Sequence, residues 1–239
     1  MDCIEVVKQV KPSIAFIIVK RSDGGYATGS GFVFSEKNIL VTCNHVIKDS
    51  IAILLKFPDK TDHLSAKVVV RDDEHDLALL KFSDETRAPL VVGSVEEVKE
   101  GMPIIFSGYP LSIEDLTTHQ GILSAITKDA TGVTTYLIDG TVNSGNSGCP
   151  LMNKSGQVIG VVNAKRRENS DLLKKVEELS PGAISIHGLD IIEIHKALIN
   201  NVQLGIGYAV PASYIPEHKI MQEYNVVPDE GADLVKLKK

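Results

Sequence analysis

The 239-residue sequence has few cysteines, no excess of positive charge and no hydrophobic run of membrane-spanning length. Its formal net charge is −6, which argues against a nucleic-acid partner or an anionic membrane, because both select clustered lysine and arginine. Asp2 and Glu5 stand where a secretory signal would be basic. We therefore expect a globular protein that is kept in the cytosol and binds neither nucleic acid nor membrane.

The three cysteines, Cys3, Cys43 and Cys149, show neither metal-ligand spacing nor a paired framework, which is typical of free thiols in a reducing compartment. Apart from His45, the histidines also lack the spacing of metal ligands. His187, for example, has no cysteine or carboxylate pattern beside it. The sequence therefore predicts no metal site and no organic cofactor.

Short runs rich in valine and isoleucine recur along most of the chain. They are IAFIIV, SGFVFS, NILVT, AILLKF, AKVVV and LALLKF, then PIIFSG, QGILSAI, TTYLID, QVIGVVNA and GIGYAVP. The runs are too short for helices, and their connections carry Asp, Gly, Ser and Pro, which supply turn geometries. This rhythm predicts an all-β sandwich or barrel, and the polar stretch 83–101 indicates a link between two small lobes.

One region departs from this rhythm. Residues 165–204 contain NSDLLKKVEEL and LDIIEIHKALIN, whose apolar residues follow helical spacing. We expect a helical insertion that serves as a lid, a dock or an oligomer surface, or as a structural decoration. A last helix is predicted over SYIPEHKIMQEY. The expected organisation is an N-terminal lobe at 1–100, a C-terminal lobe at 101–225 and a flexible tail at 226–239.

Three polar residues stand beside loops at the ends of predicted strands. His45 lies in ILVTCNHVIKD, Asp76 in DDEHDLALLKF, and Ser147 between glycines in VNSGNSGCPLM, just before an apolar strand. A serine hydroxyl is a poor nucleophile at its free pKa, so it needs a base and a group that orients the base. Each residue alone is more typical of an ordinary turn or surface position. Their joint presence favours a nucleophilic site.

Five blocks in order resemble the HtrA (DegP-like) serine proteases of the trypsin fold. They are GSGFVFSEKNILVTCNHVIKD, HDLALLKF, GYPLSIEDLTTHQGILSA, YLIDGTVNSGNSGCPLMNKSGQVIGVVNA and GIGYAVP. The resemblance runs from about residue 13 to residue 211 and is interrupted by the insertion. It implies two six-stranded antiparallel β-barrels of the chymotrypsin type, here with a helical insertion in the second barrel and a C-terminal helix.

The resemblance also implies roles for single residues. Ser147 would be the nucleophile, His45 the general base and then acid, and Asp76 the carboxylate that fixes the histidine tautomer. The N–H groups of Gly145 and Ser147 would form an oxyanion hole, in which one donor is worth about 3 kcal/mol of transition-state stabilisation.

A substrate pocket is implied on two segments near the nucleophile. Its expected lining is Thr141, Val142, Asn143, Asn163, Ala164 and Lys165. Val142 resembles the family's apolar wall, which favours a small aliphatic side chain before the scissile bond, whereas Lys165 leaves an acidic preference open. Residues 160–164 are expected to pair with an extended substrate strand.

Several features depart from the family pattern. Cys149 replaces a usual glycine, and Cys43 lies two residues before His45, so inert thiols and a redox-sensitive pair both stay open. Asn146 replaces the aspartate that pairs with a new N-terminus in trypsin-like enzymes that mature by cleavage, so we expect no zymogen cleavage. We also expect a stand-alone protease without the family's usual signal peptide and PDZ domain.

The sequence thus predicts a serine endopeptidase that hydrolyses peptide bonds of protein substrates through an acyl-enzyme on Ser147. The alternative is a protease-like binding or regulatory module with a latent active site. An esterase is disfavoured because the strand–elbow–helix context of G-x-S-x-G is missing. A second copy of the chain or an activator protein, bound through 165–204, stays open as a further partner.

Overall fold

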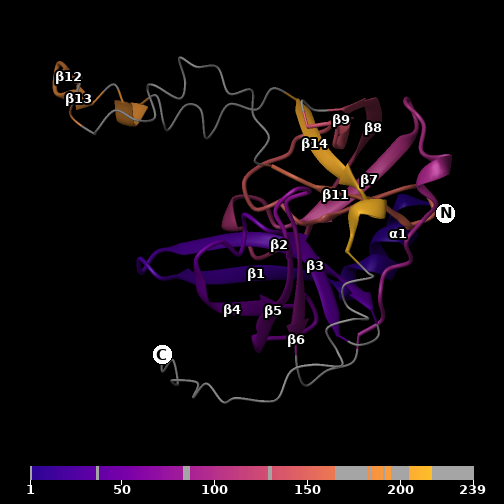
Figure 1. Ribbon diagram of the computed structural model, residues 1–239, viewed down its shortest axis with the longest axis horizontal. Coiled ribbons are helices and arrows are strands. Elements are labelled where there is room, and N and C mark those ends of the chain that lie inside the picture. Colours follow the sequence, from indigo (N-terminus) through magenta and orange to yellow (C-terminus); the bar gives the residue numbers. More distant parts are fainter. Residues whose placement is uncertain are drawn as a thin grey trace.

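The structure is a computed structural model that describes residues 2–35, 38–82, 87–128, 131–164, 182, 185–190, 192–194 and 205–216. Its body consists of two closed, six-stranded barrels. Figure 1 shows the first barrel, in indigo to purple, below the second, in magenta to yellow. The predicted all-β fold with two antiparallel barrels is confirmed.

The first barrel closes in the strand order β1-β2-β3-β6-β5-β4. Its strands are β1 (Ile14–Arg21), β2 (Tyr26–Ser35), β3 (Ile39–Cys43), β4 (Ser50–Lys56), β5 (Leu64–Asp72) and β6 (Leu77–Phe82). All neighbouring pairs are antiparallel. Each apolar run predicted in this part of the chain forms one of these strands, because the barrel interior takes alternate side chains from every strand.

The second barrel closes in the order β10-β11-β14-β9-β8-β7. Its strands are β7 (Pro103–Gly108), β8 (Thr117–Lys128), β9 (Thr134–Asp139), β10 (Pro150–Met152), β11 (Val158–Val162) and β14 (Ile206–Pro211). The short strand β10 follows the glycine-rich stretch directly, as the sequence predicts. Residues 141–149 therefore form a loop that enters the barrel wall at Pro150.

Pairing in the first barrel brings two of the candidate residues together. β3 is buried along its whole length and pairs with β6 from Ile39 opposite Lys81 to Cys43 opposite Leu77. One step further, the Asn44 N–H donates a hydrogen bond to the Asp76 carbonyl oxygen at 2.9 Å. The residue after β3 and the residue before β6 thus leave the barrel at the same edge.

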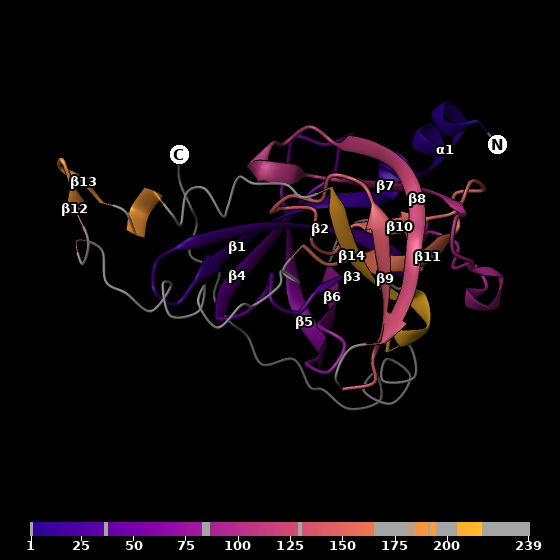
Figure 2. The ribbon, with the colours of Figure 1, turned by 90° about the horizontal axis from the view of Figure 1, so that it is seen from above.

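Helix α1 (Cys3–Val10) precedes the first barrel and is absent from the sequence prediction. Its start carries a local signal, because the Glu5 carboxylate accepts a hydrogen bond from the Asp2 N–H. Val6 and Val10, one helical turn apart, are buried. Both lie against Gly156 in the turn between β10 and β11, and Figure 2 shows α1 beside the second barrel. The start of the chain thus packs on the barrel that forms later in the sequence.

In the described part of the chain, four short 3-10 helices lie in the connections. They are η1 (Lys11–Ser13), η2 (Val95–Glu97), η3 (Pro110–Ser112) and η4 (Ala212–Tyr214). The stretch 87–101 joins the barrels and is bonded to both. Its Leu90 N–H donates to the Val33 carbonyl oxygen, and its Gly93 N–H donates to the Val158 carbonyl oxygen.

The predicted insertion is described in part. Its first helix, NSDLLKKVEEL, lies outside the described residues. At the second predicted helix, Leu189–Asp190 form strand β13, paired with β12 (Ser185–Ile186), so the prediction is wrong there. The turn explains the difference, because His187 and Gly188 have φ of 51° and 79°, as a two-residue hairpin of type I′ requires. Helical backbone is described at 192–194.

The predicted C-terminal helix is not found in the described residues. The first part of SYIPEHKIMQEY belongs to the short helix η4, after which Ile215 is extended. Residues 217–224 of that prediction, and the predicted tail 226–239, lie outside the described residues. Within the described part of the chain, none of the helices has the length and hydropathy needed to cross a membrane.

Candidate active site

A continuous chain of hydrogen bonds joins Ser147, His45 and Asp76 across the two barrels. His45 Nε2 lies 2.9 Å from Ser147 Oγ, and His45 Nδ1 lies 2.5 Å from Asp76 Oδ2. Because a carboxylate accepts, this contact assigns the proton to Nδ1 and leaves Nε2 as the acceptor for the serine hydroxyl. The Ala164 N–H donates to Ser147 Oγ at 3.2 Å, so the hydroxyl proton is directed toward His45.

Asp76 accepts hydrogen bonds from three directions. Besides His45 Nδ1, its donors are the His45 backbone N–H at 2.8 Å and the Asn163 side-chain amide at 2.9 Å. Burial acts to raise the pKa of Asp76. The hydrogen bond from the His45 ring, the charge of that ring and the other two donors lower the pKa, and together they outweigh burial. The pKa therefore lies below its usual value, and Asp76 carries a negative charge that can orient and stabilise the His45 ring.

The loop before Asp76 is built by side-chain hydrogen bonds. Asp72 Oδ1 accepts from the backbone N–H groups of Glu74 and His75, and Asp72 Oδ2 lies 2.9 Å from His75 Nδ1. The His75 ring stacks on Tyr214 of η4, with ring centroids 4.0 Å apart. His75 is thus engaged with the second barrel, and Asp76 follows it with a φ of 54°.

Ser147 lies in a tight turn that needs glycine. Gly145 has a φ of 96°, and a Cβ atom at this position would stand 2.2 Å from the Tyr109 carbonyl oxygen. The Asn146 N–H donates to the Asn143 carbonyl oxygen at 3.0 Å. Among the described residues, the N–H groups of Gly145 and Ser147 have no protein acceptor. These two donors are therefore available to an oxyanion.

Ser30 of the first barrel holds this turn and was missed by the sequence analysis. Its buried hydroxyl donates to the Gly145 carbonyl oxygen at 2.7 Å and accepts from the Tyr109 N–H at 2.9 Å. Its backbone N–H donates to the Ser147 carbonyl oxygen at 2.9 Å. A polar residue between two glycines in a buried strand, as in Gly29–Ser30–Gly31, is the signal that could have identified it.

The residues expected to bind substrate lie in two segments on either side of β14. Thr141 is exposed, whereas Val142 and Asn143 are half-buried, and Val142 lies beside Gly207. Ala164 follows β11 and contacts Ser147. The side chain of Asn163 is directed at Asp76, as described above, and its backbone N–H donates to β14. Lys165 lies outside the described residues.

Cys43 and Cys149 are both fully buried, and neither forms a disulfide. The Cys43 thiol donates to the Val162 carbonyl oxygen at 3.3 Å, and burial raises the pKa of the Cys149 thiol. Ligand atoms of Cys43, His45 and Asp76 lie within 4.8 Å of one another. We assign this cluster to the His45 and Asp76 pair rather than to a metal, because each of these atoms already has a hydrogen-bond partner.

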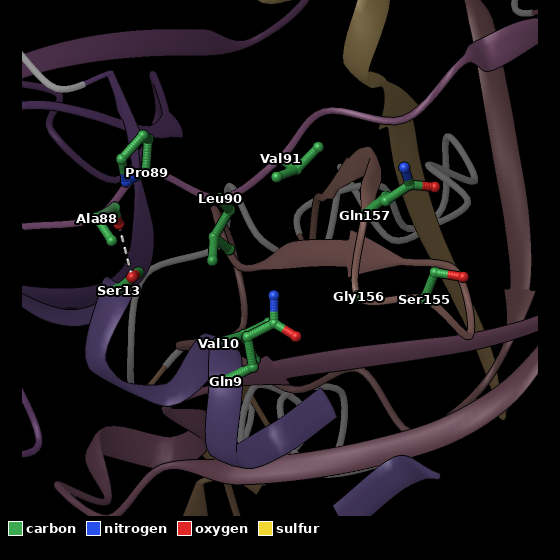
Figure 3. A pocket seen from close by; sticks show the side chains of 10 residues that line it. All are labelled: Gln9, Val10, Ser13, Ala88, Pro89, Leu90, Val91, Ser155, Gly156 and Gln157. Carbon is green, nitrogen blue, oxygen red and sulfur yellow. Dashed lines mark hydrogen bonds between the residues drawn. The ribbon is translucent and has the colours of Figure 1, made fainter. Parts of the chain in front are cut away.

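Two cavities differ in their chemistry. One of about 430 Å³ includes His45 and Ser147 in its wall. The other, of about 280 Å³, lies between α1, the connection at 88–91 and the turn at 155–157. Figure 3 shows that Ser13 and the Ala88 carbonyl group bond across its edge, at 2.7 Å. Its described lining has no titratable side chain, so only the larger cavity combines space with a nucleophile and a base.

Comparison with known proteins agrees with this geometry. Residues 29–161 match the family of trypsin-like peptidase domains. A probable periplasmic serine endoprotease, DegP-like, from Pseudomonas fluorescens is 37% identical over 136 residues, which is 56% of this chain and 28% of that protein. A protein of the same description from Rhizobium meliloti is 39% identical over 139 residues, or 56% of this chain and 27% of its own length.

A solved structure shares the fold. The HtrA-type protease AlgW with tripeptide matches with a TM-score of 0.68 and 23% identity, over 95% of this chain and 65% of that chain. The chain spans less than a third of the length of the two curated relatives given above. The matched residues nevertheless cover more than half of the chain and hold His45, Asp76 and Ser147. The chain therefore belongs to the trypsin-like peptidase family, among its HtrA (DegP-like) members.

Proposed function

We propose that this protein is a serine endopeptidase that hydrolyses peptide bonds of protein substrates through an acyl-enzyme on Ser147. The observation that carries the proposal is the chain of contacts from Ser147 Oγ through the His45 ring to Asp76, at 2.9 and 2.5 Å. A nucleophile, a base and a group that orients the base are the parts that acyl transfer needs.

The first half of the reaction uses all three side chains. Ser147 Oγ attacks the carbonyl carbon of the scissile bond while His45 Nε2 takes its proton. The Asp76 carboxylate stabilises the resulting imidazolium, and the N–H groups of Gly145 and Ser147 bind the oxyanion. The carbon–nitrogen bond then breaks, His45 gives its proton to the leaving amine, and an ester to Ser147 remains.

The second half restores the enzyme. Water attacks the ester carbonyl, and His45 takes a proton from this water. The bond to Ser147 Oγ breaks, the serine oxygen regains a proton from His45, and the new carboxylic acid leaves. Gly145 and Ser147 bind the oxyanion again in this step.

We propose that the enzyme prefers substrates with a small aliphatic side chain before the scissile bond. The alternative is a preference for an acidic side chain at that position. Val142 supports the first because its half-buried side chain lies beside Gly207 near the nucleophile turn. Backbone groups of β11 and Ala164 would pair with an extended substrate, which gives affinity that does not depend on sequence.

The cellular compartment remains a prediction. Cysteines that form no disulfide fit the reducing cytosol that we expect, whereas the DegP-like relatives are described as probable periplasmic proteins. Fractionation of cells that carry the natural gene, followed by detection of the protein, distinguishes the two compartments.

The proposed activity is tested with a fluorophosphonate probe and intact mass measurement. We expect one probe adduct, located at Ser147 by peptide mapping and missing in Ser147→Ala. Ser144→Ala is the matched control, because Ser144 is an exposed hydroxyl in the same loop. Absence of labelling in the wild-type protein would contradict the proposal and favour the alternative, a binding module with a latent site.

A further inference from the structure

The cavity beside the nucleophile extends away from the residues expected to bind the substrate before the scissile bond. It measures about 430 Å³, and its wall includes Ser144, Gly145 and Ser147. Its opposite wall comes from the first barrel, where Arg21 and Tyr26 stand at the base of the hairpin between β1 and β2. The cavity thus spans the cleft between the two barrels.

The lining shows which part of a substrate this cavity would hold. Of the described residues expected to contact the substrate before the scissile bond, at 141–143 and 163–164, none lines it. Ala164 nevertheless contacts Ser147 Oγ, so those segments adjoin the nucleophile from another side. The cavity therefore lies on the leaving-group side, where the residues that follow the scissile bond would bind.

Arg21 gives this cavity a distinct charge. It is the one lysine or arginine among the described lining residues, which include no carboxylate. Among the described residues, the Arg21 side chain has neither an ion-pair partner nor a hydrogen bond, and its Nε is buried without a partner. An arginine with unused donors in a concave site is suited to bind a carboxylate.

The position of Arg21 is fixed by its backbone. Its N–H donates to the Gly25 carbonyl oxygen at 2.9 Å, and its carbonyl oxygen accepts from the Gly24 N–H at 3.1 Å. Across the cavity wall, the hydroxyls of Thr28 and Ser112 lie 3.0 Å apart and join the two barrels. The base of the hairpin is therefore held in place before any substrate binds, which lowers the entropic cost of binding.

We propose that this cavity binds the residues after the scissile bond and that Arg21 selects an acidic side chain there. The inference rests on the proposed endopeptidase function and adds a specificity on the leaving-group side. Because the attraction is between charges in a partly screened cleft, it should weaken as the salt concentration rises.

The test uses internally quenched peptides with valine before the scissile bond and Glu, Gln or Lys at each of the three following positions in turn. At one of these positions we expect the kcat/KM for Glu to exceed that for Gln by about tenfold. Arg21→Gln should remove this ratio, and Arg21→Glu should favour Lys instead. Lys20→Gln, which removes the neighbouring charge outside the cavity lining, should keep the wild-type ratio.

Fluorophosphonate labelling of each variant separates specificity from activity. Labelling of Arg21→Gln at Ser147 shows that its nucleophile is assembled, and its specificity is then measured as the ratio of kcat/KM for the Glu and Gln peptides within the variant. Equal cleavage of the Glu, Gln and Lys peptides by the wild-type protein would overturn this inference alone. Loss of the preference in Lys20→Gln would also overturn it. Absence of both cleavage and labelling would overturn the proposed function and this inference with it.

Discussion

In the first barrel, side-chain hydrogen bonds hold His45 and Asp76, whereas in the second barrel the backbone conformation of a glycine holds Ser147. Asp72 caps the loop before Asp76 with three contacts. The turn at Ser147 instead depends on Gly145, where a side chain would meet the Tyr109 carbonyl oxygen.

The difference indicates where each half of the site is vulnerable. In the first barrel, a substitution that keeps the backbone but removes a charge should impair chemistry without unfolding the loop. In the second barrel, adding one carbon atom to a glycine should displace the backbone itself. Ser30 joins the halves, because it reaches from β2 to the turn at Gly145.

Asp76→Asn tests the first barrel's contribution to the chemistry. The amide can donate to His45 Nδ1 and so favour the wrong tautomer, and we expect kcat to fall about ten-thousand-fold while the fold is kept. Steady-state kinetics with a cleavable peptide, together with a thermal melt, measure both quantities. A loss smaller than about tenfold would show that Asp76 does not orient His45.

Gly145→Ala tests the second barrel's turn. The added Cβ would stand 2.2 Å from the Tyr109 carbonyl oxygen and would strain a φ of 96°, so the oxyanion donor should move. We expect kcat to fall about a hundredfold to a thousandfold. Gly24→Ala is the matched control, since Gly24 also has a positive φ but its Cβ would meet nothing within 4 Å. Equal activity losses in the two variants would contradict the prediction.

Ser30→Ala tests the connection between the barrels. The substitution leaves the buried Tyr109 N–H without its acceptor, which should cost about 1–3 kcal/mol of unfolding free energy. It also releases the Gly145 carbonyl oxygen, and we expect kcat/KM to fall about tenfold. Urea unfolding and peptide kinetics measure the two effects. Ser22→Ala, in the exposed turn after β1, should change neither.

The pH dependence of stability should report the charge on Asp76. Because its pKa lies below the usual value, its ionised form stabilises the folded state. That stabilisation is complete above about pH 4, the ordinary carboxyl value, and is lost as the pH falls through the lowered pKa. We expect the unfolding free energy of Asp76→Asn to fall less steeply on acidification than that of the wild type. Urea unfolding of both proteins at several pH values in this range measures the two dependences. The prediction is contradicted if the unfolding free energy falls equally steeply with pH in the wild type and in Asp76→Asn.

Oxidation should have the smallest effect. Cys43 and Cys149 are fully buried, and burial raises the pKa of the Cys149 thiol, which keeps it protonated and unreactive. We therefore expect hydrogen peroxide to leave kcat/KM unchanged and both thiols unmodified by mass measurement. A loss that a thiol reductant restores, and that Cys43→Ala prevents, would instead support the redox-sensitive pair.

Local patterns identified most of the strands. Every predicted apolar run lies in a strand, because alternate burial in a small barrel leaves a strong local signal. The prediction failed where a turn outweighed helical spacing, at His187 and Gly188. It also missed α1, whose buried Val6 and Val10 pack against Gly156 of the second barrel, far along the chain.

The sequence by itself determined the strands, the order of His45, Asp76 and Ser147, and the glycine turn around the nucleophile, because each depends on neighbouring residues or on a family pattern. Only the tertiary structure decided which side chains meet across the barrels. Asn163 turned out to support Asp76, Ser30 to hold Gly145, and Arg21 to line the cavity beside Ser147. The two hydrogen bonds join residues 87 and 115 positions apart, and Arg21 and Ser147, which line one cavity, stand 126 positions apart. No local pattern records which distant partner a buried polar side chain will find.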